Sequence, residues 1–235
     1  MSLRLFIFAL AASFGLPWLT MVVIPHFKMR DLAPIALDAA KDGGPGIFFP
    51  KRGGRIVDGA RVYAENGCYL CHTQLVRPSY AGNDLYHADW AGLKADPDRG
   101  DTRRETNPYD YDGESFAQIG VMRLGPDLSN LARRLESSEA SGADPAAVLY
   151  AHLYNPRLNP RLRYSACPPH PFLFEKREIK GTRSSEALAV DAGPDYEWIP
   201  GPDAKALISY LLSLKKDQKP PAALDFSPKP SGETP

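Results

Sequence analysis

The residues with the clearest chemistry are Cys68 and Cys71, which are separated by two residues, and His72, which follows directly. This spacing is typical of covalent haem attachment, in which two cysteine sulfurs add to the two vinyl groups of one haem. The adjacent imidazole then binds the iron as its proximal ligand. We therefore predict one covalently bound haem c, with thioethers from Cys68 and Cys71 and iron ligation by His72.

Paired cysteines also serve other chemistries. A Cys-x-x-Cys pair can form a redox-active disulfide, or it can supply half of a zinc site. A zinc site needs two further soft ligands, and Cys167 is the one cysteine left in the sequence. The histidine directly after the second cysteine favours haem.

The composition limits the elements that can position these residues. The chain has 235 residues, of which 43% are hydrophobic, so it can bury one good core. Lys and Arg total 28 and so do Asp and Glu, and this balance argues against a nucleic-acid partner. The 23 prolines and 19 glycines predict long irregular connections between the elements.

The N-terminal segment predicts a membrane anchor. Leu5 to Ile24 is a run of 20 residues without a charge, which is long enough to span a bilayer as a helix despite Pro17 in its middle. A cleaved signal peptide is the alternative, but its best cleavage site, at Ala9 to Ala11, falls inside the apolar run. We expect residues 1–30 to form a single transmembrane anchor.

The remaining segments follow from local sequence signals. Residues 31–54 are rich in glycine, proline and alanine and predict a linker, and residues 218–235 predict an extended Pro-rich tail. Between them, residues 55–217 predict an all-α haem-binding domain with long loop insertions. Four helices are expected within it. One ends at Gly67, one follows the turn at Gly125-Pro126 with Leu128, Leu131 and Leu135 on one face, one begins at Asp144-Pro145, and one begins at Gly201-Pro202. Tyr80 to Glu114 and Glu175 to Tyr196 are expected to be polar and irregular.

Several motifs together resemble one family. Gln74 and Arg77-Pro78 follow the haem motif, and further matches occur in order at Gly125–Leu128, His152–Arg157 and Ser165–Pro171. Behind a single anchor, this combination resembles the monohaem cytochrome c subunit (subunit II) of cbb3-type cytochrome c oxidases. The resemblance implies a cytochrome c domain on the periplasmic side of the inner (cytoplasmic) membrane.

The resemblance also implies a function. Such a subunit relays electrons to the polytopic catalytic subunit of the haem-copper oxidase, exchanges them with other c-type cytochromes, and is not an enzyme on its own. A second possibility is the cytochrome c subunit of a nitric oxide reductase. A third is a haem sensor or enzyme in which a labile distal ligand leaves the iron.

The distal iron ligand is where this chain departs from the family pattern. The family supplies a methionine from the loop that matches Ser165–Pro171, and here the matching residue is Cys167. Cys167 is the preferred distal ligand because it occupies that position and because prolines stiffen the loop after it. His170, Met122 and an open site are the alternatives. A thiolate would stabilise ferric iron and lower the reduction potential.

Three other polar residues have chemistry that could serve a haem. Arg77 is a possible partner of a haem propionate, since a guanidinium can form two parallel hydrogen bonds with a carboxylate. His87 is expected at the surface. His152 lies within the helix that follows Asp144 and is expected to be a buried imidazole rather than an iron ligand.

Overall fold

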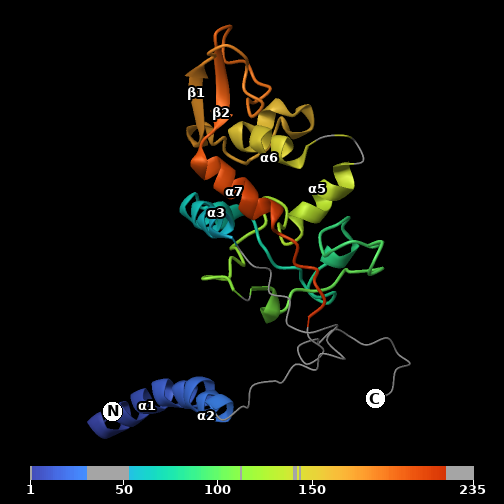
Figure 1. The fold of residues 1–235 in the computed structure, drawn as a ribbon. Coiled ribbons are helices and arrows are strands. Elements are labelled where there is room, and N and C mark those ends of the chain that lie inside the picture. Colours follow the sequence, from blue (N-terminus) through green and yellow to red (C-terminus); the bar gives the residue numbers. More distant parts are fainter. Residues whose placement is uncertain (1, 31–52, 112, 140–141, 143, 221–235) are drawn as a thin grey trace. The chain divides into compact units, whose positions relative to one another are not determined.

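The computed structural model describes residues 2–30, 53–111, 113–139, 142 and 144–220 (Figure 1). The chain divides into two compact units, residues 1–46 and 47–235. The predicted linker lies outside the described residues except for Gly53 and Gly54. The predicted tail lies outside them except for residues 218–220.

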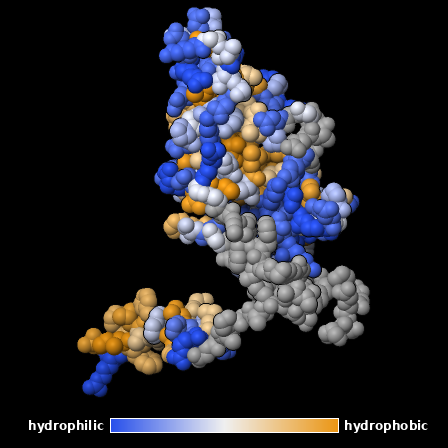
Figure 2. All heavy atoms as spheres, in the orientation of Figure 1, coloured by the Kyte–Doolittle hydropathy of each residue, from blue (hydrophilic) through white to orange (hydrophobic). Residues whose placement is uncertain are grey.

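The first unit contains one long apolar helix. It runs from Leu3 to Arg30 and consists of α1 (Leu3–Trp18), a π-helical turn η1 (Leu19–Val23) and α2 (Ile24–Arg30). Figure 2 shows hydrophobic residues over much of it. Its 28 residues correspond to about 42 Å, which is long enough to cross a membrane.

Pro17 explains the change of helix type within this helix. Proline removes one main-chain donor, and the π-helical turn begins two residues later. The Thr20 hydroxyl donates to the main-chain oxygen of Leu16 at 2.9 Å, which satisfies an acceptor near the interruption. The helix thus continues through Pro17, as the sequence predicts, and extends beyond the predicted apolar run at both ends.

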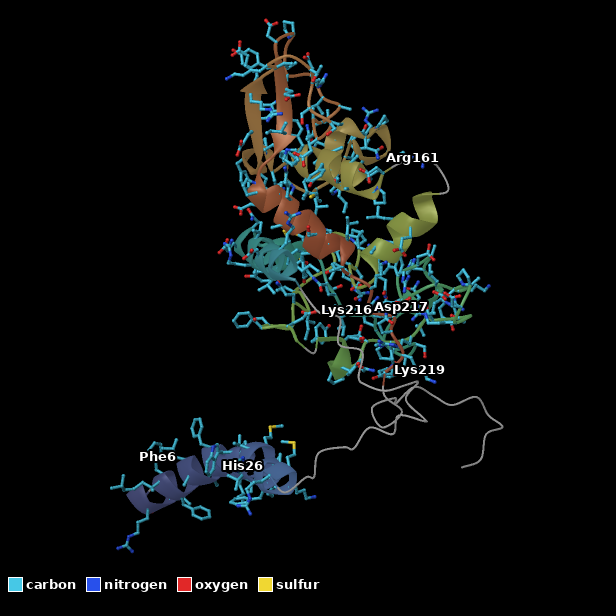
Figure 3. The ribbon with its side chains drawn as sticks, in the orientation of Figure 1. Phe6, His26, Arg161, Lys216, Asp217 and Lys219 are labelled. Atoms are coloured by element: carbon cyan, nitrogen blue, oxygen red, sulfur yellow. The ribbon has the colours of Figure 1, made fainter. Side chains whose placement is uncertain are left out.

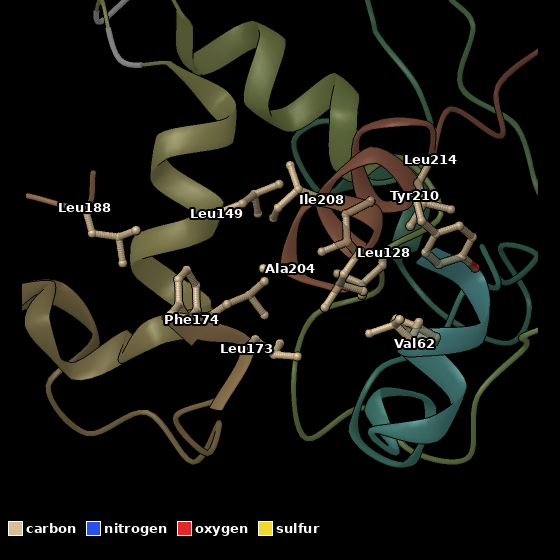
Figure 4. Packing of buried hydrophobic residues seen from close by; sticks show 14 residues of the cluster. Val62, Leu128, Leu149, Leu173, Phe174, Leu188, Ala204, Ile208, Tyr210 and Leu214 are labelled. Atoms are coloured by element: carbon tan, nitrogen blue, oxygen red, sulfur yellow. The ribbon is translucent and has the colours of Figure 1, made fainter. Parts of the chain in front are cut away.

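Two helices form the centre of the second unit. α3 (Gly54–Glu65) is followed by Gly67, whose φ of 67° is left-handed, and α7 (Pro202–Leu212) begins with proline at its first position. Both agree with the prediction. The helices pack closely at Gly59, where an added Cβ would lie 2.0 Å from the main-chain oxygen of Ala206. Figure 4 shows buried side chains of the hydrophobic core, among them Val62 on α3 and Ile208 on α7.

Two further helices complete the helical core. α6 (Pro145–Tyr154) begins after Asp144, whose carboxylate accepts from the main-chain N–H groups of Ala146 and Ala147, as expected of an N-cap. α5 (Leu131–Glu139) precedes it, and both pack on α7 (Figure 1). The short elements are α4 (Cys68–Cys71) and the 3₁₀ turns η2 (Asp84–Tyr86), η3 (Pro108–Tyr111), η4 (Pro156–Leu158), η5 (Pro160–Leu162) and η6 (Pro171–Leu173).

The prediction of an all-α domain is wrong in one region. Strands β1 (Phe174–Glu178) and β2 (Tyr196–Pro200) form an antiparallel pair in which Lys176 lies opposite Trp198. Only the first residue of β1 is buried, so the sequence Phe-Glu-Lys-Arg-Glu lacks the alternation that identifies a half-buried strand. Main-chain pairing and the packing of Phe174 and Trp198 on Tyr154 hold the strands in place.

Ion pairs organise the long polar loop and fasten the segment after α7 to it. Lys216 pairs with Glu114 at 2.8 Å. Asp217, which follows Lys216 and is labelled with it in Figure 3, has a fully buried carboxylate that accepts from Arg99 and Arg133. The main-chain oxygen of Gln218 accepts from Arg104 at 2.9 Å. The described start of the predicted tail is therefore packed on the domain.

Candidate functional site

The Cys-x-x-Cys-His motif of Cys68, Cys71 and His72 lines a large apolar pocket of the second unit. The pocket has a volume of about 810 Å³, within the usual range for small-molecule and cofactor sites. Its wall is contributed by α3, α4, α5, α6 and α7 and by the loops around residues 124–128 and 155–170. Its polar groups include the side chains of Cys68, Cys71, His72, His152, Cys167 and His170.

One short helix places both cysteines of the motif. Gly67 adopts the left-handed conformation that separates α3 from the single turn of α4, and Cys68 and Cys71 stand three residues apart on that turn. Residues at this spacing share a helix face. Burial raises the pKa of Cys68 to about 11, so this thiol is protonated near neutral pH. Both sulfurs are unbridged and face the pocket.

His72 is held in a single tautomer. Its Nδ1 lies 2.8 Å from the main-chain oxygen of Pro126. Because a carbonyl can only accept, Nδ1 must carry the proton, and the lone pair is left on Nε2. Burial lowers the pKa of His72 and outweighs the hydrogen bond to Pro126, which raises it, so the ring is neutral near pH 7. A neutral imidazole with a free Nε2 is a metal ligand.

Gly125 makes room for the ring of His72. A Cβ added at Gly125 would lie 2.2 Å from Cε1 and 2.6 Å from Nδ1 of His72. The N–H of Gly125 donates to the main-chain oxygen of Cys71 at 2.8 Å, which joins this turn to the haem motif. The Gly-Pro pair at 125–126 thus serves the imidazole twice, by leaving space and by supplying its acceptor.

Cys167 and His170 reach the same pocket from the loop after α6. The N–H of Cys167 donates to the Ser165 hydroxyl at 3.2 Å, and burial and the nearby Cys71 raise the pKa of the Cys167 thiol. His170 is 9% exposed, and its N–H donates to the main-chain oxygen of Leu153 at 2.8 Å. Among the described residues, no group accepts from or donates to its Nδ1. The loop therefore presents two possible metal ligands.

His152 also lines the pocket, a position that was not predicted from the sequence. Burial lowers the pKa of His152, and the imidazoles of His72 and His170 lower it further. The signal in the sequence is its spacing: His152 lies three residues after Leu149, which also lines the pocket. The prediction of a buried imidazole is met only in part, because His152 is half-buried, and its place beside the motif is a finding of the structure.

The structure places the remaining candidate residues elsewhere. Met122 is 52% exposed and does not line the pocket. The guanidinium of Arg77 pairs with Asp84 at 2.8 Å, and Arg77 does not line the pocket either. His87 is exposed, as expected, and its ring lies 4.6 Å from that of Trp90.

Within the described part of the chain, no group of three or more His, Cys, Asp or Glu side chains is arranged to hold a metal ion. No protein-family model matches the chain, and no curated protein matches it.

Proposed function

We propose that this chain is a membrane-anchored c-type cytochrome that relays electrons to the catalytic subunit of a cbb3-type haem-copper oxidase. The observation that carries the proposal is the hydrogen bond between His72 and Pro126. It leaves Nε2 of His72 free beside two cysteines that share a helix face, in an apolar pocket of about 810 Å³. Iron ligation and thioether attachment need these groups in this arrangement.

The pocket fits a haem chemically. Cys68 and Cys71 are unbridged and able to form thioethers, and His72 is neutral. Apolar side chains from α5, α6 and α7, among them Leu131, Leu149 and Leu211, cover much of the wall. When bound there, the haem supplies one-electron chemistry, and its potential depends on the axial ligands and their surroundings.

Cys167 is the distal ligand that we propose. It lines the pocket from a loop that prolines stiffen, and its thiol donates a weak hydrogen bond to the main-chain oxygen of Pro168 at 3.7 Å. Since burial raises the pKa of this thiol, a metal charge is required to hold it as a thiolate. His170 is the alternative, whereas Met122 lies outside the pocket lining.

Two features favour relay over catalysis. If His72 and Cys167 both bind the iron, they would leave no iron position for a substrate, and the chain would serve to hold and tune the haem. The apolar helix Leu3–Arg30 would anchor the chain in the inner membrane as a single-pass protein, with the haem domain on the periplasmic side. The partners would be the polytopic oxidase subunit and other c-type cytochromes.

A purification from native membranes tests this proposal. The full-length chain, carrying an affinity tag at its C-terminus, should co-purify with a polytopic subunit that contains haem b and copper. In that complex, oxygen should oxidise the reduced haem c. A partner with haem b and non-haem iron would instead indicate a nitric oxide reductase, and a chain that purifies alone and binds carbon monoxide would contradict the relay role.

A haem sensor is the second candidate, and one observation favours it. His170 and His152 stand in the same pocket as Cys167, so an imidazole is at hand if the thiolate leaves the iron. Carbon monoxide binding to the reduced, isolated protein would support this candidate over the relay.

A further inference from the structure

Asp127 joins the two chain segments that meet at His72. Its side chain is fully buried, and its Oδ2 accepts from the Thr73 hydroxyl at 2.6 Å and from the N–H of Leu75 at 2.8 Å. Its Oδ1 accepts from the N–H of Ser129 at 2.8 Å. The carboxylate of Asp127 thus joins the segment that follows His72 to the segment that follows Pro126.

The hydrogen bond of His72 spans the same two segments. His72 directly precedes Thr73, and its acceptor Pro126 directly precedes Asp127. The hydrogen bond from His72 to Pro126 therefore lies next to the hydrogen bond from Thr73 to Asp127. The N–H of Leu128 donates to the main-chain oxygen of Thr73 at 2.8 Å and closes the junction. A shift of either segment would change the distance from Nδ1 to the Pro126 oxygen.

A buried charge network holds Asp127 and the segment after His72. Arg123 donates to the Thr73 hydroxyl at 2.8 Å, to the main-chain oxygen of Leu75, and to Asp84 at 2.7 Å. Asp84, which is 1% exposed, also accepts from the N–H and guanidinium of Arg77, each at 2.8 Å. Buried carboxylates with this many donors are fixed in place, because each lost hydrogen bond would leave an uncompensated charge.

We propose that Asp127, held by Arg123, is a positioning residue that sets the hydrogen bond from His72 to Pro126 and thereby the electron donation of His72 to a bound iron. The inference rests on the proposed haem site. A hydrogen bond from the second ring nitrogen fixes the orientation of a ligating histidine and raises its basicity. A more basic imidazole stabilises ferric iron, so loosening this hydrogen bond raises the reduction potential.

The substitution Asp127→Asn tests the role in the full-length, haem-loaded chain. An amide has one acceptor oxygen, so it cannot receive hydrogen bonds from Ser129, Thr73 and Leu75 as the carboxylate does. We expect the haem to remain attached. At a fixed solution potential, the ratio of ferric to ferrous haem should fall about tenfold, which corresponds to a rise of about 59 mV in the reduction potential for one electron. Thr73→Val, which removes one hydroxyl from the junction, should shift the ratio in the same direction by less and provides the test if Asp127→Asn does not fold.

Asp217→Asn is the matched control. Asp217 is also a fully buried carboxylate bound by arginines and a threonine, but its partners are Arg99, Thr102 and Arg133, away from His72. It should lower stability while leaving the potential unchanged. An unchanged potential in haem-loaded Asp127→Asn, or an equal shift in Asp217→Asn, would overturn the role of Asp127. Absence of covalent haem from the wild-type chain, seen first in the spectrum of the denatured protein, would overturn the proposed function itself and this role with it.

Discussion

The Nδ1 atom of His72 lies 2.8 Å from the main-chain oxygen of Pro126, a residue 54 positions later in the chain. This contact fixes the tautomer of the ring and leaves the lone pair on Nε2, the atom that we propose binds the iron. It depends on Gly125, since a side chain there would occupy the position of the ring.

Gly125→Ala should displace the imidazole. The added Cβ would lie 2.2 Å from Cε1 of His72, and the strain should cost about 1–3 kcal/mol of unfolding free energy. The optical spectrum of the haem-loaded variant should show a changed proximal ligation, and urea unfolding should show the stability loss. Pro126→Ala keeps the main-chain oxygen and should leave the spectrum unchanged. A wild-type spectrum in Gly125→Ala would contradict the assigned contact.

Gly59→Ala should separate α3 from α7. The new Cβ would meet the main-chain oxygen of Ala206 at 2.0 Å, and a main-chain atom cannot move aside as a flexible side chain can. We expect a loss of roughly 3 kcal/mol or more in denaturant unfolding. The same substitution at Gly54, at the start of the same helix, meets no atom within 4 Å and should be nearly neutral. Equal stability of the two variants would rule out the close helix contact.

The sequence predicts the helix boundaries better than the contacts between distant segments. Gly67, Asp144 and Pro202 mark local events, the end or start of one helix, and each acts in the structure as its residue type requires. The two strands escape prediction because β1 buries only Phe174 and therefore has no apolar alternation. β1 is defined by its pairing with β2, some 20 residues later in the chain, and not by a local pattern of apolar residues.

The candidate site shows the same difference between local sequence signals and contacts between distant segments. The Cys-x-x-Cys-His spacing is local, so the sequence alone predicts a haem site at Cys68, Cys71 and His72. The partner of Arg77 cannot be recognised from the sequence, because Asp84 lies in a polar loop without periodicity. Only the folded loop brings the two residues together. Likewise, the place of His152 in the pocket depends on how α6 packs against α7.

Acid should weaken the domain through Asp84. Burial alone would raise the pKa of Asp84, but hydrogen bonds from Arg123 and Arg77 outweigh it and lower the pKa well below its ordinary value. A lowered pKa means that this contribution to stability is complete above about pH 4, the ordinary carboxylate range, and is lost as the pH falls toward the folded-state pKa. Urea unfolding between pH 2 and about pH 6 should show this decline.

Asp84→Asn should remove that part of the pH dependence. At pH 7 the variant should lose about 3 kcal/mol, at the lower end for a broken buried ion pair because Arg77 is 39% exposed. Its stability should then fall less steeply below about pH 4 than that of the wild type. Parallel acid profiles for the two proteins would show that Asp84 does not carry the effect.

Cys167→Met should change the iron ligand. The oxidised wild-type protein should give the electron paramagnetic resonance signal of a low-spin thiolate-bound haem, and the variant should lack it. A neutral thioether favours ferrous iron, so the reduction potential of the variant should be higher. His170→Ala is the companion variant: if His170 rather than Cys167 binds the iron, this substitution alone will change the spectrum.

Covalent haem attachment at Cys68 and Cys71 is the central claim, and the absorption spectrum of the denatured, reduced protein in alkaline pyridine tests it most directly. We predict the spectrum of a haem with both vinyl groups saturated, one haem for each chain, retained after acid-acetone extraction. Cys68→Ala combined with Cys71→Ala should lose it, and Cys167→Ala should keep it. A wild-type chain without haem, or one whose haem is extracted by acid acetone, would contradict the account.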